Sequence, residues 1–214
     1  MLGKTLSVWV ALTYVTSLNA QTVDVEKYLL DPNYERQLAH SAGPDHVADK
    51  ASIWLWTKKG YQISKHGDNG FNCIVMRAFS TESMGFTSNL DPKMLAPVCF
   101  NQGASEFILP VVLKKGDWAA KGWNEQQFIN GMKESYINGT FRLPNTLSIG
   151  YMLSEHQYLN AKVKNGMPHM MLYSAYTNDL EWGGHAFNSD YPFVLADDTP
   201  VTVSIIPLKK FNRL

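Results

Sequence analysis

The chain has 214 residues with 19 basic and 19 acidic side chains, so it offers no global basic field to attract nucleic acid or an anionic membrane surface. Hydrophobic residues make up 45% and aromatic residues 12%, which is typical of a packed globular protein and excludes a wholly disordered one. The length fits one domain with enough chain to bury a real core.

The first twenty residues have the pattern of a secretory signal peptide. Lys4 supplies a positive charge, and residues 6–15 form an apolar run that is too short to span a bilayer. Cleavage is expected after Ala20, with cleavage after Ser17 as the alternative. Because the leader holds one basic and no acidic residue, the mature chain keeps 18 basic and 19 acidic side chains. We therefore expect residues 21–214 to form a single globular domain that is exported to the periplasm or beyond and has no membrane span.

A helix is predicted within residues 24–42. Asp31 followed by Pro32 is a typical helix start, with the carboxylate as N-cap and proline in the first turn. The segment before Pro32 could be a separate short turn, and Gly43 followed by proline ends the helix.

Three β-rich segments follow, separated by short polar turns. They are residues 51–57, 61–65 and 71–79. The short links predict an antiparallel three-stranded meander. Trp54 and Trp56 share one face of the first segment, which favours core packing, with a stacking surface for a flat ligand as the alternative.

The two cysteines, Cys73 and Cys99, predict a disulfide in an exported protein. Such a bridge would fix the loop at residues 81–97 to the third strand and contribute about 3–4 kcal/mol in the chain-entropy model. A free nucleophile or a metal thiolate is the alternative. Arg77 lies in the same apolar strand, where it needs an acidic partner. It therefore predicts a salt bridge, with contact to an anionic ligand as the alternative.

The middle of the chain contains one clear helix, at residues 124–137. Asn124 can cap it and Gln127 can complete a capping box. Residues 105–121 are compatible with a strand or a helix.

The last third is rich in β-formers. Predicted strands there lie at residues 149–159 and 168–175, which form a hairpin, and at residues 193–195 and 201–206. Together with the helices they predict an α+β fold of one domain.

The hairpin carries two histidines that could bind a metal. If its turn is centred between Lys162 and Val163, His156 lies opposite His169, near enough for both imidazoles to hold one divalent ion. Asp179, Glu181 or His185 could supply a third ligand. A shift of register by one residue would place the rings on opposite faces, and two unrelated histidines are the alternative.

Short motifs recur in an order that resembles a known family. They are GFNC at residues 70–73, Arg77, PVC at 97–99, YMLS at 151–154 and PHMMLY at 168–173. The set resembles a family of exported bacterial proteins with no assigned function, from about residue 38 to residue 206. The resemblance implies an exported domain with helices and strands and brings no activity. Because Pro168-His169 fits the family pattern and the position of His156 varies, the resemblance favours His169 as the residue to test.

The sequence lacks the GxSxG, GxGxxG, P-loop, HExxH and CxxC motifs, which argues against the familiar serine-hydrolase, nucleotide-binding and zinc-protease classes. The leading hypothesis is a non-enzymatic exported protein that binds a small molecule or a metal near the hairpin at residues 148–174. The alternatives are a hydrolase that uses His169, with His156 and a metal, and a structural or partner-binding envelope protein.

Overall fold

The computed structural model describes the chain except for residues 1–20, 163–165, 184–190, 196–198 and 213. The predicted signal peptide lies outside the described residues.

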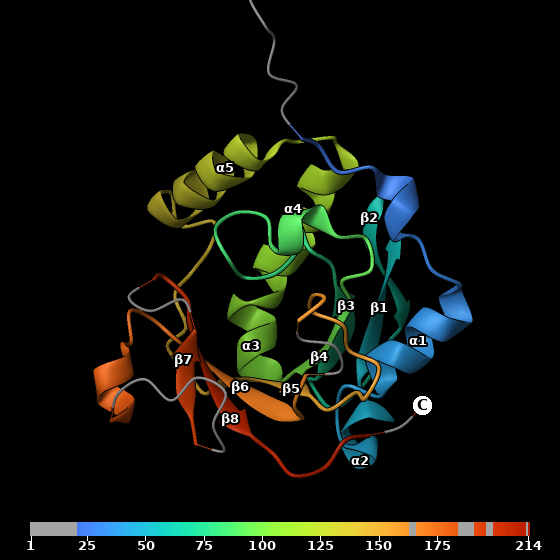
Figure 1. The fold of residues 1–214 in the computed structure, drawn as a ribbon, viewed down its shortest axis with the longest axis vertical. Coiled ribbons are helices and arrows are strands. Elements are labelled where there is room, and N and C mark those ends of the chain that lie inside the picture. Colours follow the sequence, from blue (N-terminus) through green and yellow to red (C-terminus); the bar gives the residue numbers. More distant parts are fainter. Residues whose placement is uncertain (1–20, 163–165, 184–190, 196–198, 213) are drawn as a thin grey trace, which may run out of the picture.

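One mixed sheet of eight strands runs through the described part of the chain, in the order β2-β1-β3-β4-β5-β6-β8-β7 (Figure 1). Its strands are β1 (Ser52–Thr57), β2 (Gly60–Lys65), β3 (Asn72–Met76), β4 (Ala96–Phe100), β5 (Ser148–Met152), β6 (His169–Ser174), β7 (Phe193–Leu195) and β8 (Thr202–Pro207). This mixed sheet, together with the helices that pack on it, confirms the predicted α+β class.

Helices cover both faces of the sheet. They are α1 (Pro32–His40), α2 (Asp45–Ala48), α3 (Gln102–Phe107), α4 (Leu109–Ala120) and α5 (Glu125–Ile137), with single 3-10 turns η1 (Val25–Tyr28), η2 (Ser88–Leu90) and η3 (Asp179–Trp182). Residues 105–121, whose sequence is compatible with a strand or a helix, are mainly helical and belong to α3 and α4. Within the described ranges, none of these helices has the length and apolar character needed to cross a membrane.

Local capping signals place two of these helices where the sequence predicts them. The Asp31 carboxylate accepts hydrogen bonds from the backbone N–H groups of Asn33 and Tyr34, and Pro32 follows it at the start of α1. Residues 25–28 form a separate turn. Asn124 and Gln127 form the predicted reciprocal capping box of α5.

The predicted antiparallel meander is wrong, because β3 runs parallel to β1 and lies on the side of β1 away from β2. The chain that follows β2 passes across the N-terminal end of β1. There the Gly67 N–H donates to the Ser52 hydroxyl, and the Asp68 N–H donates to the carbonyl oxygen of Lys50. Only glycine fits this crossing, since a Cβ on Gly67 would collide with the Lys50 backbone. The polar residues between β2 and β3, which include Asn69-Gly70, therefore form a crossing loop rather than the short turn of a meander.

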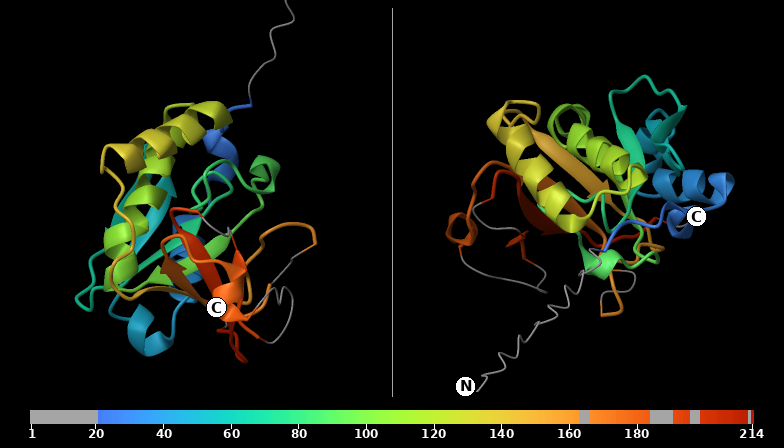
Figure 2. Two further views of the ribbon diagram at one scale, coloured as in Figure 1. Left: turned by 90° about the vertical axis from the view of Figure 1, so that its left-hand side faces the viewer. Right: turned by 90° about the horizontal axis from the view of Figure 1, so that it is seen from above.

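Both faces of the β1–β3–β4 region are buried, so its side chains alternate between two cores. Ile53 and Leu55 pack with Val75 against α1, in a cluster that also holds both cysteines. Trp54 and Trp56 point to the opposite face and pack in the larger cluster, which α3, α4 and α5 cover (Figure 2). Trp56 is thus part of the core and the partly buried Trp54 packs against it, as favoured from the sequence.

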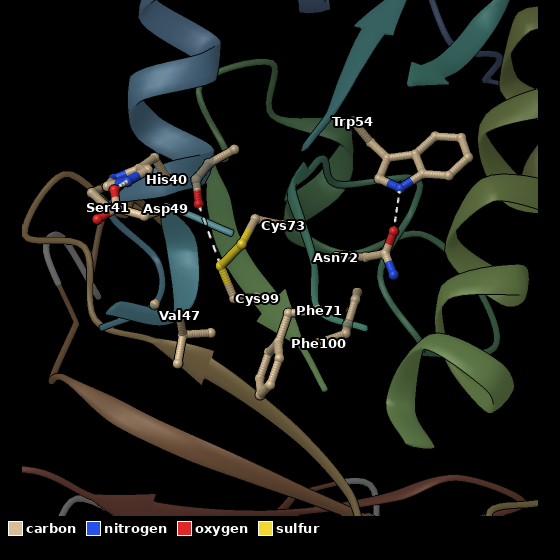
Figure 3. The surroundings of a disulfide bond; sticks show 12 residues. His40, Ser41, Val47, Asp49, Trp54, Phe71, Asn72, Cys73, Cys99 and Phe100 are labelled. Carbon is tan, nitrogen blue, oxygen red and sulfur yellow. Dashed lines mark hydrogen bonds and ion pairs between the residues drawn. A yellow bond between two sulfur atoms is a disulfide. The ribbon is translucent and has the colours of Figure 1, made fainter. Parts of the chain in front are cut away.

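Cys73 and Cys99 form the predicted disulfide (Figure 3). They lie directly opposite each other on the antiparallel strands β3 and β4 and are fully buried. The end of α1 packs on the bridge, with the Ala39 carbonyl oxygen 3.6 Å from Cys99 Sγ. Gly43 follows, and a Cβ there would come within 3.0 Å of the same sulfur. The bridge thus joins the two strands that flank the loop at residues 81–95 and supports α1.

Removing the disulfide should destabilise the fold. We expect the double variant Cys73→Ala with Cys99→Ala to lose about 3–4 kcal/mol of unfolding free energy, because the crosslink closes a loop with a sequence separation of 26. Urea denaturation followed by circular dichroism measures the loss. A reducing agent should lower the stability of the native chain and leave the double variant unchanged. Equal stability of the double variant and of the native chain with its disulfide intact would contradict a structural role for the bridge.

Candidate functional site

The structure does not bring the two hairpin histidines together. In the β5–β6 register, His169 lies opposite Met152, so the predicted pairing of His156 with His169 is wrong. His156 lies beyond the end of β5 and is itself exposed, with its ring nitrogen 3.5 Å from a carboxylate oxygen of Glu155.

The register differs because the chain leaves the hairpin directly after Met152. The Leu153 N–H donates to the Ala42 carbonyl oxygen, and Tyr158 exchanges backbone hydrogen bonds with Leu95. These backbone groups are used by distant segments and are not available to extend the pairing with β6. A symmetrical hairpin through residue 159 therefore does not form.

His169 is buried at the start of β6. Its Nδ1 lies 2.7 Å from the Met167 carbonyl oxygen, so Nδ1 carries the proton and donates. Burial lowers the pKa of the His169 ring below its ordinary value, and the Met167 contact opposes this. Within the described residues, no three His, Cys, Asp or Glu side chains gather closely enough to hold a metal ion. His185 lies outside these residues, and metal binding by His169 stays a prediction.

Arg77 forms the predicted salt bridge. Its guanidinium is fully buried, with Nη2 2.8 Å from Glu35 Oε1 on α1. Nη1 donates to the Val75 carbonyl oxygen at 2.7 Å, and Nε donates to the Tyr28 carbonyl oxygen at 3.4 Å. Glu35 also accepts the Trp56 N–H, so its carboxylate links α1 to β1. Burial raises the pKa of Glu35, and the charge of Arg77 opposes that rise.

A cavity of about 480 Å³ lies between the segment that follows β3, helix α5 and the strands β7 and β8. Its apolar lining residues are Met84, Met94, Leu159, Leu195, Pro200, Val201 and Val203. Its polar lining residues are Thr81, Glu82, Ser83, Thr87, Tyr136 and Thr199. The volume and the mainly apolar surface match those of sites that hold small organic molecules. Leu159 comes from the β5–β6 connection, so this cavity borders the predicted hairpin region, whereas Arg77 and His169 do not line it.

Hydrogen bonds at both ends fix the segment that forms one cavity wall. At its start, the Arg77 N–H donates to the Ser80 hydroxyl, and the Ser80 N–H donates to the Arg77 carbonyl oxygen. At its end, the N–H and the hydroxyl of Thr87 both donate to the Ala78 carbonyl oxygen, at 2.8 and 3.0 Å. The chain between these two points therefore forms a closed loop with fixed ends.

A buried lysine on α4 holds the middle of this loop. Lys115 is fully buried, and its Nζ donates to the carbonyl oxygens of Thr81, Ser83 and Gly85, at 2.7, 2.7 and 3.1 Å. Burial lowers the pKa of Lys115 to about 7, and the negative charge of Glu82 opposes this shift.

Glu82 lies on the same loop, and its negative charge interacts with the positive charge of Lys115. Burial raises the pKa of its carboxyl, and its own backbone N–H and the charge of Lys115 act against that rise. Its Oε2 atom is buried with no hydrogen-bond partner among the described residues. Burial likewise raises the pKa of Tyr136, and the Glu82 charge adds to the rise.

Sequence reasoning missed both Lys115 and Glu82. Helical spacing would have found Lys115, because it lies four residues after Val111 and three before Trp118, on the apolar face of α4. Glu82 carries no such signal, since it lies in a loop.

Comparisons with protein-family models, with curated proteins and with solved structures gave no match to this chain.

Breaking the Arg77–Glu35 pair should be costly. We expect Glu35→Leu to lose about 3–5 kcal/mol of unfolding free energy, because it leaves a buried guanidinium without its counter-charge. Adding Arg77→Met should recover part of this loss. Chemical denaturation of both single variants and the double variant gives the coupling energy. Strictly additive losses would contradict a direct interaction between the two side chains.

Proposed function

We propose that this chain is an exported binding protein for a small, mainly apolar molecule, held in the cavity beside the segment at residues 81–84. The observation that carries the proposal is the cavity itself. Its volume of about 480 Å³ lies within the range of roughly 300–1,000 Å³ that is usual for small-molecule sites.

The charges around the cavity favour an uncharged ligand. While Lys115 is protonated, its charge behind the wall attracts the negative charge of Glu82 on the wall, so the two offset each other without help from a ligand. The apolar body of a ligand would contact Met84, Met94 and Leu195, and the polar side chains of the lining could orient one polar group.

Export is the second part of the proposal. The buried Cys73–Cys99 disulfide supports it, because such bridges persist in oxidising compartments outside the cytosol. The apolar run at residues 6–15 is in keeping with it. The hydrolase hypothesis gains no support, since His156 and His169 are not paired across the hairpin and His169 does not line the cavity.

The binding proposal predicts saturable uptake of an uncharged aromatic probe. N-phenyl-1-naphthylamine, excited directly, should gain fluorescence on titration with the purified protein. The double variant Leu159→Trp with Leu195→Trp should bind it at least about tenfold more weakly, because two larger side chains fill the cavity.

The matched control carries the same two changes elsewhere. Leu147 and Leu180 are exposed and do not line the cavity, so Leu147→Trp with Leu180→Trp should bind the probe like the native chain. Absence of saturable binding, or equal weakening by both double variants, would contradict a ligand site in this cavity. Absence of binding would favour the structural or partner-binding alternative.

A further inference from the structure

The cavity wall depends on a side chain that does not touch the cavity. Thr81, Glu82, Ser83 and Met84 supply four consecutive lining residues, and the carbonyl groups of Thr81 and Ser83 both point to Lys115 Nζ. The loop ends are fixed through Arg77 and Ala78, as described above. Lys115 therefore fixes the middle of the wall between those ends.

This arrangement requires the ammonium form of Lys115. An ammonium group has three N–H donors, and here it meets three carbonyl acceptors. A neutral amine has two N–H donors and a lone pair, so one of these three buried or part-buried carbonyl oxygens would face a lone pair. Because an unsatisfied buried carbonyl group is unfavourable, the wall should shift when Lys115 loses its proton.

We propose that Lys115 is a positioning residue of the ligand site, and that ligand affinity is high when Lys115 is protonated and falls when it becomes neutral. This inference rests on the proposed binding function and adds its regulation by pH.

Other titratable groups near Lys115 could also contribute a pH dependence through their contacts. Glu82 is the charged group whose interaction with Lys115 is resolved, and the ring of Phe128 on α5 lies 5.9 Å from Nζ, where its π-face favours a cation. Tyr136 and Tyr173 both sense the charge of Glu82, and burial raises the pKa of each above its ordinary value. Both tyrosines therefore stay neutral over the range in which Lys115 titrates.

Other titratable groups lie on the packed elements. Glu125 at the start of α5 accepts the Phe86 N–H, at the outer end of the wall segment. Tyr61 on β2 packs beside Gly116, and burial raises the pKa of its hydroxyl.

The direction of the pH effect follows from the Lys115 environment. Burial lowers its pKa to about 7, and its three carbonyl contacts favour the ammonium. Affinity should therefore fall as pH rises from about 6 to about 9.

Global stability should move the other way. The unfolded chain keeps its lysine protonated to about pH 10, so between the two pKa values the unfolded state binds the extra proton. Through this group the free energy of unfolding rises with pH. Titration of Lys115 itself would therefore not destabilise the fold as pH rises.

The experiment measures affinity for N-phenyl-1-naphthylamine across this pH range. We expect binding by the native chain to weaken at least about fivefold between pH 6 and pH 9, in step with a shift of the Met84 methyl signal in the ligand-free protein labelled with [13C-methyl]methionine. Lys115→Met should bind weakly at every pH. Glu82→Gln should keep the transition but move its midpoint to lower pH, because it removes the negative charge that favours the ammonium.

Each arm can overturn the inference. Binding that is independent of pH in the native chain would end it and leave the binding function standing. Absence of binding at any pH would end the binding function, and the Met84 signal would still test the shift of the wall. Loss of the transition in Glu82→Gln would assign it to Glu82. If Lys115→Met does not fold, the midpoint in Glu82→Gln decides alone.

Discussion

The fold depends on how it accommodates one buried guanidinium. A charged side chain without partners is strongly unfavourable in a protein core, so the position of Arg77 constrains everything around it. Its partners come from α1, from η1 and from β3 itself, and the Glu35 carboxylate extends the contact to β1. The ion pair thus joins the first helix to the sheet at the point where β3 ends. The Cys73–Cys99 bridge joins β3 to β4 a few residues earlier, on the face that α1 covers.

A second buried cation, Lys115, holds the loop between Arg77 and the cavity. Arg77 fixes the start of the loop that follows β3, and Lys115 holds its middle through three carbonyl groups. Irregular backbone seldom lies in a protein interior, because its polar groups need partners there. Here one ammonium group satisfies three of them. An irregular segment can therefore serve as one wall of an apolar cavity whose other walls come from α5, β7 and β8.

Local sequence signals predicted the helix caps and the disulfide correctly, but not the order and register of the strands. The N-cap of α1 at Asp31, the capping box of α5 and the disulfide follow from neighbouring residues or from a simple count of cysteines. The parallel pairing of β3 and the register of the hairpin depend on partners far away in the chain, such as Lys50 for the crossing loop and Ala42 for Leu153. The sequence predicted a binding site near the hairpin and did not predict this cavity, because its walls come from four separate segments that no local pattern connects.

The central claim is that an uncharged apolar molecule binds inside this cavity. The most direct measurement is a ligand titration of protein labelled with [13C-methyl]methionine, because Met84 and Met94 line the cavity and Met170 on β6 does not. We expect N-phenyl-1-naphthylamine to shift the methyl signals of Met84 and Met94 in a saturable manner and to leave that of Met170 unchanged. Saturable shifts at Met170 with no change at Met84 and Met94 would contradict it.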